Sequence, residues 1–230
     1  MVEIKEVHMS NDLLFKEILC HEDNREKLIH YIMLMTGISK NKIRRNLNVQ
    51  YESVLKKTKL NEKAYRADVL VKFDGYIINL ESYSYFNINS FKKSTNYIMR
   101  IYSTISKQGD KLEDLQSVIQ INLIDNVKIK FDPNIKSEYY IINGNDIEDK
   151  KIADEFKMIY YRIDKAEEIP YNELTEEVRW IRFLGAQSSE ERRLLAEGDE
   201  MLMELSDWVE KFINDEEIKE VLWKMVQRTS

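Results

Sequence analysis

The side chains of Asp68 and Glu81 are two carboxylates that the sequence pattern predicts to face each other on a β-hairpin. The hairpin signal is Asp74-Gly75, because runs rich in β-branched and aromatic residues flank this pair on both sides. If these two residues form the turn, Asp68 lies directly opposite Glu81. The Cβ atoms of such a pair lie about 5 Å apart, and like charges there are destabilising. Some positive charge must therefore offset the repulsion between the two carboxylates.

Two sources of that positive charge are open. A divalent cation such as Mg²⁺ could bind both carboxylates, since hard cations take carboxylate oxygens together with substrate phosphate. Alternatively, Arg66 and Lys72, which the same register places on the same face, neutralise the pair on a solvated sheet. The register itself is an expectation, because a four-residue loop keeps the pairing whereas a three-residue loop moves the carboxylates to opposite faces.

The alternation of side chains along the two strands predicts one apolar and one polar face. The apolar face is expected to pack on the core and comprises Val69, Val71, Phe73, Tyr76, Ile78 and Leu80. The polar face comprises Arg66, Asp68, Lys72, Asn79, Glu81 and Tyr83. The candidate chemistry therefore lies on a single face of the hairpin.

The order D-x(12)-E-x-Y on a hairpin followed by a helix resembles the PD-(D/E)XK nuclease superfamily. Within that superfamily, the chain is most similar to the recombination-promoting nuclease and transposase-like family. Short motifs in the family's order carry the resemblance over most of the chain: Asp12 to Lys16 (D-L-L-F-K), Lys63 to Asp68 (K-x-x-R-x-D), Glu81, Lys93 to Tyr102, Gln108-Gly109, Leu115 to Ile124 and Trp180 to Leu184.

The resemblance implies an α/β, restriction-endonuclease-like fold, in which helices flank a mixed β-sheet. It also implies a metal-dependent phosphodiesterase site that cuts DNA and serves DNA recombination. In such a site Asp68 and Glu81 hold Mg²⁺ or Mn²⁺ together with a backbone carbonyl near Ser82, and Asp12 completes the metal shell through water. A simpler role for Asp12 is that of a cap or a favourable charge at the start of a helix.

Tyr83 departs from the family pattern, because its position usually carries lysine or glutamine. Tyrosine has a pKa of about 10 and offers a neutral hydroxyl at neutral pH rather than a cation. Either Lys72 or Lys93 stands in for the missing catalytic lysine, or the site has lost turnover. In the second case the chain is a catalytically inactive nuclease fold that binds nucleic acid or a protein partner. Ala67, in place of proline before Asp68, is a smaller departure.

The composition is that of a soluble globular chain. Hydrophobic residues make up 43% of its 230 residues, enough for a core, and no run approaches the roughly eighteen apolar residues of a membrane span. The charged N-terminus argues against a signal peptide. The single cysteine, Cys20, excludes an internal disulfide and suits a reducing cytosol, so we expect a cytoplasmic protein. The three histidines show no zinc-site spacing.

The charge distribution permits DNA binding, although the net charge is −6. Residues 1–164 carry 26 Lys+Arg and 24 Asp+Glu, a balance of +2, whereas residues 165–230 carry 9 and 17, a balance of −8. The near-neutral part can present a basic cleft while the acidic tail faces away from it or covers it. Basic runs at 40–45 and 56–59 are typical of solvated loops, or of phosphate contacts in a nuclease.

The element pattern predicts two parts, a nuclease-like core over residues 1–168 and an acidic helical extension over residues 169–230. Besides the hairpin, the core is expected to hold helices that start near residues 12, 23 and 89, and strands at 48–55, 117–124, 139–142 and 157–163. In the extension, Ser188 and Glu191 form a capping box for one long helix with a heptad-like apolar seam. The seam packs on the chain's own core, or it forms a homo-oligomer. A purely structural assembly is thus a third candidate function.

Overall fold

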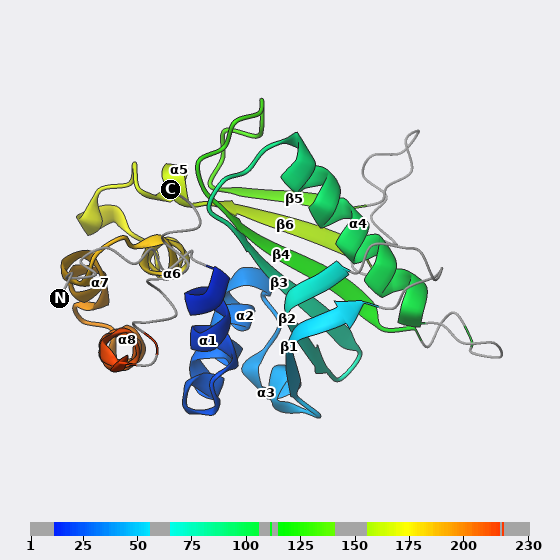
Figure 1. The fold of residues 1–230 in the computed structure, drawn as a ribbon, viewed down its shortest axis with the longest axis horizontal. Helices are drawn as coiled ribbons and strands as arrows, with labels where there is room; N and C mark the ends of the chain where they lie inside the picture. The colour runs from blue at the N-terminus through cyan, green and yellow to red at the C-terminus, as the bar shows by residue number, and fades with distance from the viewer. Residues whose placement is uncertain are drawn as a thin grey trace.

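The computed structural model describes residues 12–55, 65–105, 111, 115–140, 156–216 and 218, without the side chains of residues 12–14, 51–55 and 65–67. Its helices and strands follow one another in this order (Figure 1): α1 (Asp12–Cys20), η1 (Glu22–Asn24), α2 (Arg25–Thr36), α3 (Lys40–Arg44), β1 (Asn48–Leu55), β2 (Tyr65–Phe73), β3 (Tyr76–Tyr83), α4 (Ile88–Ile105), β4 (Ser117–Ile124), β5 (Lys136–Tyr140), β6 (Phe156–Arg162), α5 (Ile163–Ala166), η3 (Tyr171–Glu173), α6 (Glu176–Gly185), α7 (Ser189–Ala196) and α8 (Glu200–Asn214).

The described strands form one mixed sheet in the order β1-β2-β3-β4-β6-β5. The strands β3, β4 and β6 run parallel, and the β1–β2, β2–β3 and β5–β6 pairs are antiparallel. Helix α4 connects β3 to β4 and covers one side of the sheet, whereas α1 and α2 lie on the other side (Figure 1). The predicted α/β fold with helices on a mixed sheet is confirmed, and β1 and β4 have the expected bounds.

The hairpin of β2 and β3 has the predicted register. Pairing runs from Phe73 opposite Tyr76 to Val69 opposite Leu80, so Asp74 and Gly75 form a two-residue turn. Gly75 has a φ of 77°, a left-handed conformation that glycine adopts without steric cost. Because the register has no slip, Asp68 and Glu81 occupy the same side of the hairpin, as predicted.

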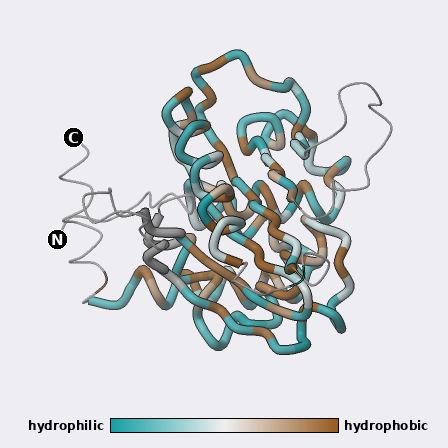
Figure 2. The backbone as a smooth tube through the Cα atoms, turned by 90° about the vertical axis from the view of Figure 1, so that its right-hand side faces the viewer, coloured by the Kyte–Doolittle hydropathy of each residue, from teal (hydrophilic) through white to brown (hydrophobic). Residues whose placement is uncertain are grey.

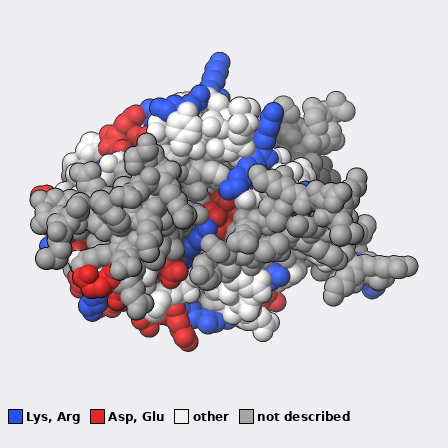
Figure 3. All heavy atoms as spheres, in the orientation of Figure 1, with Lys and Arg blue, Asp and Glu red and all other residues white. Residues whose placement is uncertain are grey.

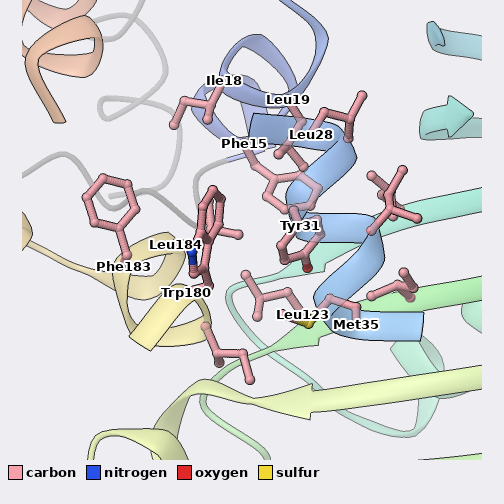
Figure 4. Close-up of a cluster of buried hydrophobic side chains, with 14 of the residues drawn as sticks. Phe15, Ile18, Leu19, Leu28, Tyr31, Met35, Leu123, Trp180, Phe183 and Leu184 are labelled. Atoms are coloured by element: carbon pink, nitrogen blue, oxygen red, sulfur yellow. The ribbon is translucent and has the colours of Figure 1, made fainter. Parts of the chain in front are cut away.

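The predicted apolar face of the hairpin packs into the larger of two hydrophobic clusters. Val69, Val71 and Leu80 are fully buried there against side chains of α1, α2 and α6. Figure 4 shows how Trp180 of α6 enters this cluster beside Tyr31 of α2, with their ring centroids 6.3 Å apart. The same cluster continues into α7 and α8, so the C-terminal helices share their core with the N-terminal ones.

The opposite face of the hairpin is covered around the carboxylate pair and is not the solvated surface of the second explanation, whereas neutralisation by Arg66 stays a prediction because its side chain lies outside the described ones. Helix α4 covers it with Tyr97, Ile98 and Ile101, and these pack with Leu70 and Ile77 into a second hydrophobic cluster. Figure 2 shows the hydrophobic residues gathered in the middle of the molecule, where the strands lie. Asp68, Asn79, Glu81 and Tyr83 of this face are therefore held inside the protein.

The C-terminal part departs from the single long helix that the sequence pattern predicts. The chain turns at Gly198, whose φ is 78°, and this turn separates α7 from α8. Both helices have side-chain caps, Ser188 for α7 and Asp199 for α8. Of the predicted seam residues, Leu205 is buried in the chain's own core, Met201, Trp208 and Phe212 are partly buried against it, and Leu194 is 42% exposed. Oligomerisation through these helices stays a prediction, as does the boundary at residue 168.

Two smaller expectations also changed. The basic segment around residues 40–45 is a short helix, α3, which Ser39 caps, and not a loop. The expected strand at 139–142 overlaps β5, which begins three residues earlier, at Lys136. Residues 141–142 and the basic run at 56–59 lie outside the described residues. Among the helices that the structure describes, none is both long and apolar enough to cross a membrane.

Candidate active site

Asp68 and Glu81 lie together where the ladder between β2 and β3 ends. Beyond the Val69–Leu80 pair, the backbone N–H of Asp68 donates a hydrogen bond to Oε1 of Glu81 over 3.1 Å. In return, the backbone N–H of Ser82 donates to Oδ2 of Asp68 over 3.5 Å. Each carboxylate is thus held by an amide of the opposite strand, and the structure brings the two predicted metal ligands to one place.

Glu81 is completely buried at this point. Its Oε1 atom also accepts a hydrogen bond from Nδ2 of Asn79 over 3.2 Å, and its Oε2 atom accepts one from the Tyr83 hydroxyl over 3.5 Å. Burial raises the pKa of Glu81 well above its usual value, and the negative charge of Asp68 raises it further. The positive charge of Lys93 lowers this pKa but does not cancel the two larger effects. A cation placed between the carboxylates would stabilise their charged forms.

Lys16 of α1 lies beside the carboxylate pair, a position that the Asp12–Lys16 motif alone did not predict. Its Nζ atom lies 3.3 Å from Oδ1 of Asp68, and the residue is only 6% exposed. The signal for it was a lysine within the apolar stripe that includes Phe15, Ile18 and Leu19. Asp12 begins the same helix, but its side chain lies outside the described ones, so its contribution to a metal shell stays a prediction.

Of the two lysines predicted to support Tyr83, the structure brings Lys93 to the site. The Nζ atom of Lys93, on α4, lies 5.3 Å from the ring centroid of Tyr83 and 5.0 Å from that of Tyr97. Lys72 pairs with Ile77 near the hairpin turn, four residues and about 13 Å along the strand from Asp68. Arg66 lies in β2 with its side chain outside the described ones.

Tyr83 fills the third motif position with a buried phenol. Burial raises the pKa of Tyr83 well above its usual value, and the negative charges of Glu81 and then Asp68 raise it further. The hydroxyl therefore stays protonated and acts as a donor to Glu81. In this role Tyr83 orients a carboxylate, whereas a lysine at the same position would supply a charge.

The donor set fits a divalent cation. Mg²⁺ is usually bound through one or two carboxylates, with substrate phosphate and water completing its shell, and Asp68 and Glu81 provide such a pair. Among the described residues, no group of three or more His, Cys, Asp or Glu side chains converges, so the pair stands without a third carboxylate there. Asp68, Glu81 and the predicted backbone carbonyl near Ser82 are the groups that would hold the metal.

A second buried polar network joins α4, β4 and β6. Oγ of Ser94 donates to Oδ1 of Asn122 over 2.9 Å and lies 2.9 Å from the Tyr160 hydroxyl. Nε2 of Gln120 donates to both Ser94 and Asn122, over 2.7 and 2.8 Å. Gln120 lies opposite Asn79 in the parallel β3–β4 ladder, so this network begins on the strand next to the residue that donates to Glu81. Sequence patterns for apolar strands could not have shown it.

A polar pocket of about 560 Å³ opens beside Tyr83 at the N-terminal end of α4. Asn87 caps this helix, because its Oδ1 atom accepts the backbone N–H groups of Asn89 and Ser90 over 2.8 and 3.2 Å. Figure 3 shows basic and acidic side chains next to one another near the middle of one face of the molecule. The pocket is lined by Tyr83, Asn87, Asn89, Ser90, Lys92, Lys93 and Asn96.

The comparison with protein families agrees with this geometry. The family model described as PD-(D/E)XK nuclease family transposase matches residues 9–228. The chain belongs to this family. No curated protein matches the chain. Asp68, Glu81 and Tyr83 remain the residues that we predict for the first acidic, second acidic and lysine positions of the motif in the family's name.

Membership of the PD-(D/E)XK nuclease family transposases covers both the sheet and the C-terminal helices, because the match extends over all the described elements. It establishes a nuclease-type family for the chain. Among the described side chains, Lys16 places an ammonium group beside Asp68 and Lys93 places one beside Tyr83.

Proposed function

We propose that the chain is a metal-dependent DNA endonuclease of the recombination-promoting, transposase-like type, which hydrolyses phosphodiester bonds with Mg²⁺ or Mn²⁺. The observation that carries this proposal is the buried Asp68–Glu81 pair, held by reciprocal backbone amides and flanked by Lys16 and Lys93. Burying two carboxylates side by side is costly unless a positive charge offsets them. A divalent metal ion bound by both carboxylates would offset that cost.

The residues have distinct roles in this proposal. A bound divalent cation would lower the pKa of a water molecule and stabilise the negative charge that develops on the phosphate. Asp68 and Glu81 hold that cation, while Asn79 and Tyr83 donate to Glu81 and fix its orientation. Lys93, on the side of α4, stabilises charge on the phosphate in place of the motif lysine. Lys72 lies too far along β2 for the same role.

A second candidate function is an inactive nuclease fold that binds DNA or a protein partner. Tyr83 supports it, because a buried neutral phenol at the third motif position offers no positive charge to a phosphate. The Lys16–Asp68 ion pair agrees with it as well, since it already neutralises one carboxylate in the absence of a metal.

Cleavage of a supercoiled plasmid separates the two candidates. We expect nicking with Mg²⁺ or Mn²⁺ that EDTA stops and that Asp68→Asn and Glu81→Gln each abolish. Matched controls are Asp207→Asn and Glu190→Gln, exposed positions of α8 and α7, which should retain the wild-type rate. If wild-type protein nicks no faster than Asp68→Asn yet still binds the plasmid, the binding module is the better description.

A further inference from the structure

Tyr85 presents an exposed aromatic ring two residues beyond the third motif position. Its side chain is 49% exposed, in contrast to its neighbours Tyr83, which is 8% exposed, and Phe86, which is completely buried. It lies two residues beyond the end of β3, the strand that carries Glu81 and Tyr83. Single exposed aromatic residues are common, so a binding role for Tyr85 depends on its backbone contacts and on the charged side chains near it.

The backbone around Tyr85 is fixed on both sides. Phe86 forms a parallel bridge with Val127, and the N–H of Lys128 donates to the Phe86 carbonyl over 2.8 Å. On the other side, the Oγ atom of Ser90 donates to the Tyr85 carbonyl over 3.3 Å. The buried Phe86 ring anchors the segment in an aromatic cluster. The protein therefore presents the Tyr85 ring from a fixed backbone, which reduces the entropy lost when a flat ligand stacks on it.

One cation lies beside this ring, and two more line the neighbouring pocket. The Nζ atom of Lys128 is 5.9 Å from the centroid of Tyr85, and Lys128 is exposed. On the side of α4, the exposed Lys92 and Lys93 line the polar pocket, into which Ser90 also projects. An aromatic platform with ammonium groups in its neighbourhood matches the two repeating parts of a nucleic acid strand, a base with a flat π face and an anionic phosphate.

The geometry favours an unpaired strand over a duplex. In a duplex the faces of the bases are stacked within the helix, so a base can stack on Tyr85 only when it is free of its neighbours. The carboxylates are also recessed, because Glu81 is 0% and Asp68 only 7% exposed. A flexible strand can bring its phosphate down to them, whereas a regular duplex keeps its backbone on the outside of a stiff rod.

We propose that this site takes unpaired DNA, with a base stacked on Tyr85 and the adjoining phosphates bound by Lys92 and Lys128. This inference rests on the proposed function, since it names the substrate class of the same site. Single-strand binding of this kind combines a basic track with aromatic stacking and tolerates many base sequences. Unpaired stretches, at hairpins, flaps or bubbles, would then be where the protein acts.

The test is fluorescence anisotropy of the full chain with a labelled oligonucleotide, single-stranded or annealed to its complement, in Ca²⁺ as a hard cation in place of Mg²⁺. Gel electrophoresis confirms that the oligonucleotide remains intact. We expect the single strand to bind at least tenfold more tightly than the duplex. Tyr85→Ala should weaken single-strand binding by about 5- to 150-fold, the range for loss of one base–aromatic stack, whereas Tyr85→Phe should retain it.

Tyr171 gives a matched control, because it is 43% exposed and also lies beside a cation, with the Arg182 guanidinium 4.3 Å from its ring centroid. Tyr171→Ala should bind the single strand like wild type. Lys92→Ala should weaken binding and reduce its salt dependence, whereas Lys211→Ala, an exposed lysine of α8, should not.

Duplex binding as tight as single-strand binding would overturn the inference, and so would a Tyr85→Ala variant that binds the single strand like wild type. Failure of the inference is distinguishable from failure of the proposed function. Metal-dependent plasmid nicking with no preference for unpaired DNA retains the nuclease and removes this substrate class. Single-strand binding that depends on Tyr85, without any cleavage, retains the stacking site and removes the nuclease.

Discussion

The Nζ atom of Lys16 lies 3.3 Å from Oδ1 of Asp68, and both side chains are less than a tenth exposed. This ion pair joins α1 to the end of β2, and therefore connects the first described helix to the motif on the hairpin. It places a fixed ammonium group beside the carboxylate pair. In the metal-free protein Lys16 supplies part of the positive charge that the two carboxylates need.

The first prediction concerns Lys16→Met. Removing one partner of a buried ion pair costs about 3 kcal/mol or more, because the other charge stays buried, so the variant should lose that much unfolding free energy. Saturating Mg²⁺ should restore part of the loss, since it brings a positive charge to the same carboxylate. Urea unfolding with and without Mg²⁺ measures both effects.

A half-exposed ion pair gives the control for Lys16. Lys165 contacts Glu168 at the surface, and Lys165→Met should cost less than about 1 kcal/mol. If Lys16→Met destabilises the protein no more than Lys165→Met does, the Lys16–Asp68 pair does not offset the charge of the buried carboxylates.

The second prediction is that Glu81→Gln stabilises the metal-free protein. The pKa of Glu81 is raised in the folded state by burial and by Asp68, so the folded chain binds a proton that the unfolded chain releases above its usual pKa of about 4.5. Wild-type stability therefore falls as the pH rises from there through the folded-state pKa. Glutamine resembles the protonated form and avoids this loss, so we expect a gain of about 0.5–2 kcal/mol at pH 8.

The pH dependence distinguishes this effect from a general change in packing. The advantage of Glu81→Gln should shrink as the pH is lowered towards 4, where wild-type Glu81 is protonated as well. Mg²⁺ should stabilise wild type and leave the variant almost unchanged. Thermal unfolding at several pH values in EDTA and in Mg²⁺ measures these differences, and a Glu81→Gln variant less stable than wild type at pH 8 in EDTA contradicts the explanation.

The third prediction compares Lys72 and Lys93, the two lysines predicted to substitute for the motif lysine. Lys93→Ala should slow cleavage by about 100-fold, the effect of removing one stabilising group from a transition state, and Lys93→Arg should recover part of it. Lys72→Ala should stay within a few-fold of wild type, because it lies about 13 Å along the strand from Asp68. Single-turnover cleavage rates compare the variants, and equal losses at both positions would mean that the position of Lys93 over Tyr83 is not what matters.

The fourth prediction concerns Cys20, which burial makes unreactive. Desolvation raises the pKa of its thiol to about 12, and the nearby Glu17 raises it too. Since the thiolate is the reactive form, a disulfide reagent at pH 8 should modify the folded protein at least 100-fold more slowly than the urea-unfolded chain. Rapid modification of the folded protein would show that α1 opens readily or is packed differently.

The hairpin and its register were predictable from sequence because they depend on local rules. A two-residue Asp74-Gly75 turn fixes the pairing, and strict alternation then places Asp68 and Glu81 on one face. The strand of residues 117–124 was equally clear, since it is a continuous β-rich run. The order of the motifs along the chain indicated the family, which the family match confirms.

What could not be predicted depends on contacts between distant segments. The polar face of the hairpin looks solvated in the sequence, and only the packing of α4 shows that Glu81 is buried. The role of Lys16 requires α1 to lie against β2, 52 residues later by sequence number. The prediction of one long C-terminal helix was wrong because Gly198 falls on a heptad position. The same spacing therefore fits both a continuous helix and two helices joined by a turn.

The most direct test of the metal site is anomalous diffraction from a crystal grown with Mn²⁺. We predict a single strong anomalous peak between the Asp68 and Glu81 carboxylates, absent from crystals of Asp68→Asn. A peak elsewhere, or no peak at this pair at saturating Mn²⁺, would contradict the assignment of these two residues as the metal ligands of a nuclease.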